Sequence, residues 1–290
     1  MRKKFSLIIA SFLSILVQAQ MPDTDIWLFK IQADKENKLT VKGGKNITER
    51  VGYDNQPTFS NDGKRIYYSS VREDKQADIF YYDLKTKKNV RLTTSITESE
   101  FSPIDTDNGK FISTVTVEAD SAQRIHFMNT FSGNYDRKYE LDSIGYYSFL
   151  NKDTLVYYKL TKPHSLYFYV LSTGEDKWLV NNPIRGFKTI NPHLLLFGIK
   201  DSLKVTFYKF NFHLSKAIKY CEFPSNNEDI LWHKSLGLLK SEGVKIYQYH
   251  EPTRQWRILF DLSSYGLKKI TRFEFDKDDE MLLLVDNTTL

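Results

Sequence analysis

A short aromatic-rich strand recurs six times along this chain, and this repetition constrains the fold more than any other feature. The six copies occupy residues 25–29, 78–82, 124–128, 165–169, 204–208 and 245–249. Their aliphatic anchor residues follow one another at intervals of 39 to 53 residues and are Ile26, Ile79, Ile125, Leu166, Val205 and Ile246. Self-similarity at this period is typical of architectures that repeat one small structural unit.

A hairpin pattern precedes five of these strands. In the best-formed copy, residues 57–68, the Asp62-Gly63 pair supplies a turn in which glycine tolerates positive φ. Weaker copies begin at residues 99, 148, 189 and 230, and a sixth, residues 273–285, ends the chain with no third strand after it.

The strands missing from that last copy are found at the other end of the chain. Residues 25–31 and 38–41 have the pattern of a third and a fourth strand with no first and second before them. We therefore expect the two ends to pair. The sequence predicts an all-β fold over residues 20–290, a six-bladed β-propeller of four-stranded blades whose last blade is closed by the N-terminal strands.

The N-terminus has the features of a secretory signal. Arg2, Lys3 and Lys4 precede an apolar run at residues 5–17, and Val17 and Ala19 are small residues at the positions that a signal peptidase recognises. We predict a signal peptide at residues 1–19. Its removal lowers the formal charge from +5 to +2, which leaves no compositional case for nucleic-acid binding.

The same features predict the compartment. The apolar run is too short to span a bilayer, which needs about 20 residues, and no later segment comes close. Cys221 is the only cysteine, so no intramolecular disulfide forms, and we interpret it as a small buried side chain. We expect a monomeric, soluble protein that is periplasmic or secreted.

Residues 57–93 resemble a known family. The segment Pro57-x-Phe59-Ser60-x-Asp62-Gly63-Lys64 continues into Ile66-Tyr67-Tyr68, then Asp78-Ile79-Phe80 and Arg91-Leu92-Thr93, and is similar to the repeat of TolB-type six-bladed propellers. The resemblance implies this fold for the mature chain. TolB is a periplasmic protein-binding component with a separate N-terminal domain, for which we expect no room here.

The sequence nominates no catalytic, cofactor-binding or metal-binding residue. It lacks a Gly-x-Ser-x-Gly nucleophile motif and a zinc-binding His-Glu-x-x-His motif. We expect its six histidines to pack against strands or lie at the surface: His126, His164, His193, His213, His233 and His250.

Two local patterns have two readings each. Asp105, Asp107 and Gly109 alternate like a calcium loop, but Thr116 stands where the bidentate acid belongs, and the repeat places a hairpin turn here. The 42 aromatic residues, dense at residues 146–147, 157–158 and 167–169, suit packing between blades, while a sugar-binding surface stays open.

These observations favour a function without deciding it. We expect an exported, non-enzymatic propeller scaffold that binds a protein or peptide partner in the bacterial cell envelope. The alternative is an enzyme or a carbohydrate-binding propeller that acts at the channel axis. In either case the innermost strands should line the channel, which directs attention to residues 58–60, 101–103 and 148–150, beginning at Thr58, Phe101 and Ser148.

Overall fold

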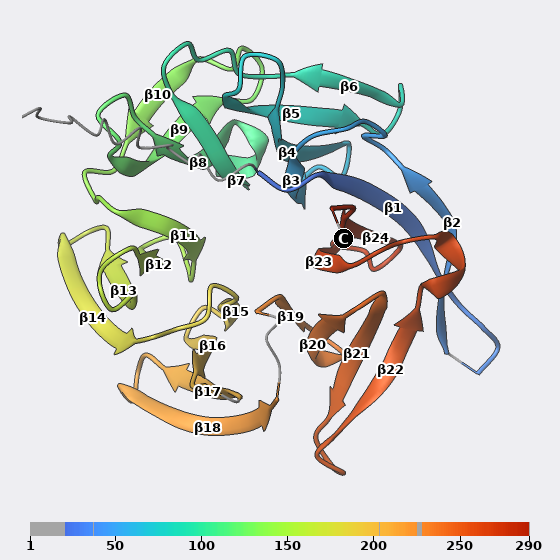
Figure 1. The fold of residues 1–290 in the computed structure, drawn as a ribbon. Helices are drawn as coiled ribbons and strands as arrows, with labels where there is room; N and C mark the ends of the chain where they lie inside the picture. The colour runs from blue at the N-terminus through green and yellow to red at the C-terminus, as the bar shows by residue number, and fades with distance from the viewer. Residues whose placement is uncertain (1–20, 37, 203, 225–227, 290) are drawn as a thin grey trace, which may run out of the picture.

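The computed structural model describes residues 21–36, 38–202, 204–224 and 228–289. Within them, 24 strands form six four-stranded antiparallel sheets, with two short 3-10 segments, η1 (Asp107–Gly109) and η2 (Ser263–Tyr265). The sheets radiate from a common centre as the blades of one ring (Figure 1). The predicted all-β, six-bladed propeller is confirmed. The predicted signal peptide lies outside the described residues, and within them no helix is long and apolar enough to cross a membrane.

Each blade runs from an inner to an outer strand. The inner strands are β3 (Asp54–Phe59), β7 (Ser99–Thr106), β11 (Ile144–Phe149), β15 (Lys188–Asn191), β19 (Ile230–His233) and β23 (Ile270–Phe275). The second strands are β4 (Arg65–Val71), β8 (Phe111–Val117), β12 (Thr154–Lys159), β16 (Leu194–Lys200), β20 (Gly237–Glu242) and β24 (Met281–Asn287).

The outer half of each blade is built in the same order. The third strands are β5 (Ala77–Asp83), β9 (Gln123–Asn129), β13 (Ser165–Val170), β17 (Val205–Asn211), β21 (Lys245–His250) and β1 (Thr24–Ala33). The outermost strands are β6 (Lys88–Arg91), β10 (Tyr135–Lys138), β14 (Glu175–Asn181), β18 (Lys216–Phe223), β22 (Gln255–Asp261) and β2 (Leu39–Asn46). We number the blades 1 to 6 from the one that begins with β3.

Blade 6 joins the two ends of the chain, as the repeat pattern predicts. Its strand order is β2-β1-β24-β23, and β1 pairs with β24 from Thr24 opposite Asn287 to Lys30 opposite Met281. The Thr289 side chain also accepts a hydrogen bond of 2.8 Å from the Asp23 amide. The ring is therefore closed by backbone hydrogen bonds between segments about 260 residues apart in the chain.

The repeated strand of the sequence is the third strand of every blade. All six anchor residues named above are fully buried. In five blades the anchor pairs with the fifth residue of the second strand, for example Ile79 with Ser69. In blade 4 the residue in that register is Phe207, opposite Gly198, so this copy is offset by two residues from Val205.

The hydrophobic core is divided among the blade interfaces. Six clusters of buried side chains each join two neighbouring blades, as Tyr67 and Ile79 of blade 1 do with Ile112 and Met128 of blade 2. A blade therefore needs bulk on both faces, which explains strands without polar alternation. The dense aromatic segments take part, because Tyr157 is fully buried between blades 2 and 3.

The two faces of the ring differ in their connections. We call the side on which each inner strand turns into the second strand the hairpin face. We call the opposite side, where the chain passes from one blade to the next, the linker face. Inner strands run from the linker face to the hairpin face, so a residue's position along its strand gives its depth in the channel.

Candidate functional site

One residue of each inner strand occupies the same register around the channel. Each of these six residues pairs with the third residue of the neighbouring second strand, and each is partly exposed. They are Thr58, Ile104, Ser148, Lys188, Leu231 and Glu274. We call this set the channel ring. A lysine and a glutamate thus lie in a ring whose other members are uncharged.

The sequence located part of the channel ring. Thr58 and Ser148 belong to it, as the repeat alignment predicted. In blade 2 a β-bulge between Phe101 and Ile104 shifts the register, so Ile104 takes the ring position that we expected within residues 101–103.

Two other expected channel residues lie outside the channel wall. The buried Ser60 hydroxyl accepts hydrogen bonds from the Lys64 and Arg65 amides in the first hairpin turn. Leu150 is buried in the cluster between blades 3 and 4. Both residues follow the last strand residue, where the chain turns away from the axis.

Glu274 is held in place by blade 1. One oxygen of its carboxylate, Oε1, accepts hydrogen bonds from the Thr58 hydroxyl at 3.1 Å and from the Phe59 amide at 3.3 Å. Burial raises the pKa of Glu274, and the charge of Lys188 together with these two donors opposes the rise. The wall of the channel therefore fixes the orientation of this carboxyl group.

Lys188 has a different environment in blade 4. Burial lowers its pKa, and the nearby positive charge of Arg272 lowers it further, while Glu274 and Asp229 act in the opposite direction. Within the described chain its ammonium forms no ion pair. Lys188 is thus a cation close to another cation, in a place where charge is poorly solvated.

Arg272 lies closer to the linker face than the channel ring. It pairs in register with Val285, two residues along β24 from the partner of Glu274. Its Nε donates a hydrogen bond of 3.0 Å to Asn55 Oδ1, and its guanidinium carbon lies 5.7 Å from the centre of the Tyr146 ring. Asn55 thus holds Arg272 through Nε, while its two terminal nitrogens make no ion pair with described residues.

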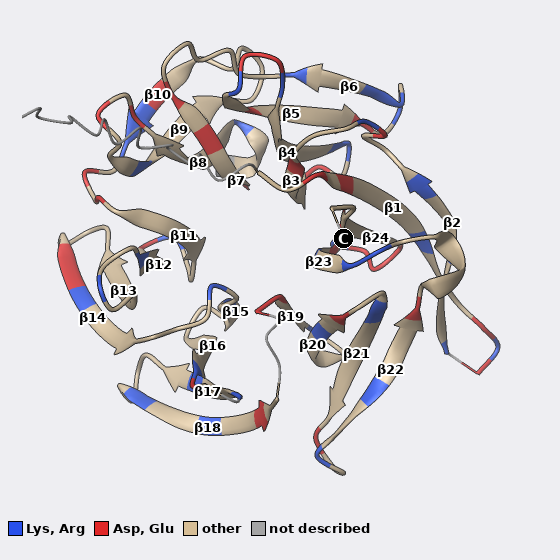
Figure 2. Cartoon of the chain, viewed as in Figure 1, with Lys and Arg blue, Asp and Glu red and all other residues tan. Residues whose placement is uncertain are grey.

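A second arginine near the linker face is neutralised. Arg185 Nη2 donates to both carboxylate oxygens of Asp229, each at 3.1 Å. Burial raises the pKa of Tyr53 to about 12, against the influence of Arg272. Among the described residues, the linker half of the channel therefore contains one arginine in an ion pair, one arginine without an ion pair, and the Tyr53 phenol. Figure 2 shows charged positions near β15, β19 and β23 as well as on the outer strands.

Three of the hollows formed by the described residues bear on the search for a site. A cavity of about 270 Å³ on the hairpin face is lined by Thr58, Ser60, Ile104, Asp105, Glu274 and Lys277, among others. A second, of about 160 Å³, lies beside His233 and Asp279.

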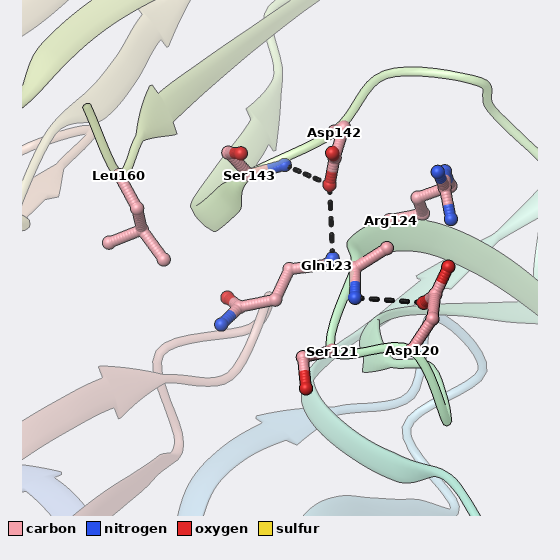
Figure 3. A pocket seen from close by; sticks show the side chains of 8 residues that line it. Asp120, Ser121, Gln123, Arg124, Asp142, Ser143 and Leu160 are labelled. Carbon is pink, nitrogen blue, oxygen red and sulfur yellow. Dashed lines mark hydrogen bonds between the residues drawn. The ribbon is translucent and has the colours of Figure 1, made fainter.

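The third hollow is a wider depression away from the axis. It has a volume of about 400 Å³ and lies between the β8–β9 turn and the start of blade 3 (Figure 3). There Asp142 accepts hydrogen bonds from the backbone amides of Gln123 and Ser143, so its carboxylate braces the loop.

The calcium-like segment is a hairpin turn that contacts blade 1. Asp105 Oδ2 accepts a hydrogen bond of 2.7 Å from the Asn61 amide, which ties two neighbouring hairpins together. Burial raises the pKa of Asp105, and Asp62 adds to the rise. Among the described residues no group of three or more His, Cys, Asp or Glu side chains is placed to hold a metal ion.

The histidines are dispersed around the ring. His126 and His233 are buried and bonded to Glu118 and Asp279, each at 2.8 Å. The rings of His193 and His213 lie 4.1 Å apart on exposed turns of blade 4. The buried position predicted for Cys221 is confirmed.

Sequence comparison assigns the chain to no family: no family model matches it, and no curated protein does. Solved structures do match. A putative TolB from Agrobacterium tumefaciens has a TM-score of 0.61 at 10% identity, over 93% of this chain and 100% of that one. A putative gluconolactonase has a TM-score of 0.61 at 8% identity, over 90% of this chain and 98% of that one.

TolB from Acinetobacter baumannii has a TM-score of 0.52 at 13% identity, over 69% of this chain. The matched part of this chain spans only 52% of that longer protein. Likeness at such low identity establishes the fold, a TolB-like six-bladed β-propeller, and leaves the activity to be argued from the site.

Proposed function

We propose that this protein is an exported scaffold that binds a protein or peptide partner in the bacterial cell envelope through the linker-face mouth of its channel. The observation that carries the proposal is the pair formed by Arg272 and Lys188, two cations without an ion-pair partner among the described residues. Both side chains are only partly exposed, and a cation that is withdrawn from water without a partner is costly to a fold. A bound anion would offset this cost.

The position of these residues supports binding rather than a structural role. Their neighbours Phe273 and Ile190 pack into the clusters between the blades, whereas Arg272 and Lys188 belong to none of the six clusters. Rigid rings of this kind present irregular loops and an axial opening to partners. The TolB-like fold is compatible with this role but does not assign it.

Export is the first part to test. The full-length chain with a C-terminal tag would be expressed in a Gram-negative host and recovered from the periplasm. Intact mass should show cleavage after Ala19, with Gln20 as the first residue. Recovery of uncleaved protein in the cytoplasm would contradict export.

Partner binding is the second part. Tagged mature protein would be cross-linked in its native envelope and purified, and co-purifying proteins quantified by mass spectrometry. We expect one or two proteins in amounts comparable to the bait, and their loss in a Lys188→Met/Arg272→Gln double variant. Arg257→Gln, an exposed arginine on β22, is the matched control. Recovery that is identical for the double variant would refute the channel as the binding site.

A second candidate function is catalysis or saccharide binding at the hairpin-face cavity. Two carboxyl groups with raised pKa values, Glu274 and Asp105, line that cavity. Carboxyl groups with shifted pKa values are the acids and bases of many active sites. This candidate predicts that aldonolactones or oligosaccharides raise the melting temperature of the wild type but not of Glu274→Gln. Metal analysis of the purified protein would separate the candidates further, because a stoichiometric ion favours an axial enzyme.

A further inference from the structure

We infer that the linker half of the channel binds a single carboxylate group of the partner peptide, held between Arg272 and Lys188. This inference rests on the proposed function and adds the chemistry of recognition to it. It follows from the hydrogen bonds, the charge balance and the depth of three side chains in the channel.

The first step concerns the available donors. Asn55 holds Arg272 through Nε, which leaves the terminal nitrogens of the guanidinium for a ligand. A guanidinium presents these nitrogens in a fixed, planar arrangement that matches the two oxygens of a carboxylate. Arg185 is not equivalent, because both oxygens of Asp229 already occupy it.

The second step concerns charge. Arg272 and Lys188 contribute two positive charges, and Glu274 contributes at most one negative charge. Glu274 is turned toward blade 1 by its bonds to Thr58 and Phe59, and it makes no ion pair with either cation. With Glu274 ionised the set has a net charge of +1, which a singly charged anion balances and a phosphate dianion would exceed.

The third step concerns depth. Arg272 lies two residues closer to the linker face than Glu274 along β23, whereas Lys188 and Glu274 share the register of the channel ring. An anion that enters from the linker face therefore meets Arg272 first and then reaches the level of Lys188, where Glu274 is turned toward blade 1. The Tyr146 ring lies 5.7 Å from the guanidinium carbon of Arg272, and burial raises the pKa of the Tyr53 phenol nearby to about 12, so Tyr53 does not oppose the charge of Arg272.

The test uses the whole mature protein and defined probes. The Nε–Hε signal of Arg272 in ¹⁵N-labelled protein, assigned by its loss in Arg272→Gln, reports binding. The peptide probes are N-acetyl-triglycine as free acid and as amide, and N-acetyl-Ala-Glu-Ala amide. Sodium glucuronate is added as a non-peptide carboxylate, and sodium chloride keeps the ionic strength constant.

We expect saturable shifts with the peptide carboxylates and at least tenfold weaker binding of triglycine amide. The two peptide acids distinguish a chain terminus from an acidic side chain as the source of the group. Lys188→Met should weaken binding by tenfold or more, and Arg257→Gln should leave it unchanged. Glu274→Gln, which preserves shape and removes a competing negative charge, should strengthen binding severalfold.

Several results would overturn the inference. One is equal binding of N-acetyl-triglycine as acid and as amide, and another is a signal shift with sodium chloride as large as that with the carboxylates. A third is weaker binding after Glu274→Gln, which would indicate a cation site. Binding of glucuronate alone would show that the peptide source is wrong. If carboxylates bind but no envelope protein is captured, the proposed function fails while the site stands. If an envelope protein is captured in a way that depends on Arg272 but carboxylates do not bind, the proposed function stands and the carboxylate site fails.

Discussion

The Thr58 hydroxyl donates a hydrogen bond of 3.1 Å to the carboxylate of Glu274, 216 residues later in the chain. Thr58 belongs to the first complete blade and Glu274 to the blade that closes the ring. The bond therefore exists only once the two ends of the chain have paired. It connects ring closure to the orientation of a charged group in the channel, so the fold and the candidate site are assembled together.

Closure of blade 6 is expected to be essential for folding. Deletion of residues 25–41 from the mature protein removes all of β1 but Thr24 together with the first three residues of β2, and exposes the edge of β24. Unpaired strand edges promote aggregation. We expect insoluble protein, or protein without a cooperative thermal transition by circular dichroism.

A circular permutant provides the control for this deletion. Joining residue 289 to residue 21 and opening the chain between β22 and β23 keeps every strand and makes blade 6 continuous. It should be soluble and melt within a few degrees of the wild type. A soluble, cooperatively melting deletion variant would contradict the closure argument.

Two glycines with the same backbone conformation should differ sharply in their tolerance of alanine. Gly133 and Gly174 both have φ of 72°. A Cβ on Gly133 would lie 1.9 Å from the Leu92 carbonyl oxygen, whereas the nearest atom to one on Gly174 is the Tyr169 hydroxyl at 3.6 Å. Gly174→Ala should cost about 1 kcal/mol for positive φ alone, and Gly133→Ala at least twice as much. Urea unfolding measures both, and equal losses would mean that the backbone around Leu92 adjusts freely.

Stability should fall as the pH rises through neutrality because of Glu100. This fully buried residue accepts hydrogen bonds from the Thr93 and Ser95 hydroxyls, and burial raises its pKa to about 7. Its unfolded pKa is about 4.5, so its protonated form favours the fold. The contribution is complete below pH 4.5 and is lost as the pH rises through 7, on the order of 3 kcal/mol.

Urea unfolding at pH 5 and pH 8 tests this dependence. Glu100→Gln should be more stable than the wild type at pH 8 and should lose most of the difference at pH 5. Glu73→Gln, at an exposed position on the neighbouring blade 1, is the control. A wild-type protein whose stability is flat between these values would show that Glu100 ionises without cost.

The thiol of Cys221 should be inert in the folded protein. The residue is 6% exposed, and burial raises the pKa of its thiol to about 12. The thiolate is the reactive form, so labelling by a disulfide reagent at pH 8 should be about a thousandfold slower than for an ordinary thiol. A Thr94→Cys variant in a Cys221→Ala background supplies that thiol, because Thr94 is exposed. Fast labelling of native Cys221 would place it at an accessible surface.

The recurrence of one strand was enough to predict the blades, because the third strand of every blade is buried between two neighbouring blades. Each copy therefore requires apolar side chains at the same positions. Ile79, Ile125 and Ile246 are buried for the same reason, so their side chains carry the period in the sequence. In blade 4 the pattern was two residues out of register. There both Val205 and Phe207 are fully buried, and periodicity alone cannot choose between them.

The candidate site was not predicted from sequence because its members share no local pattern. Lys188, Arg272 and Glu274 come from two blades, and each copy of the repeat has a different residue at the channel position. A bulge in β7 moved the ring position of blade 2 to Ile104, beyond the expected residues. Alignment of the six inner strands from their hairpin turns would have placed Glu274 beside the channel. It would not have shown that two cations without ion-pair partners lie near Glu274.

The sequence by itself determined the class of fold, the number of blades and the pairing of the chain ends, since strand period and missing strands are properties of local segments. Only the tertiary structure decided which side chains face the axis and which charges remain unpaired there. Coulomb interactions depend on distances in space, and ring closure brings Thr58, Lys188 and Glu274 to one level of a channel although they lie far apart in the chain.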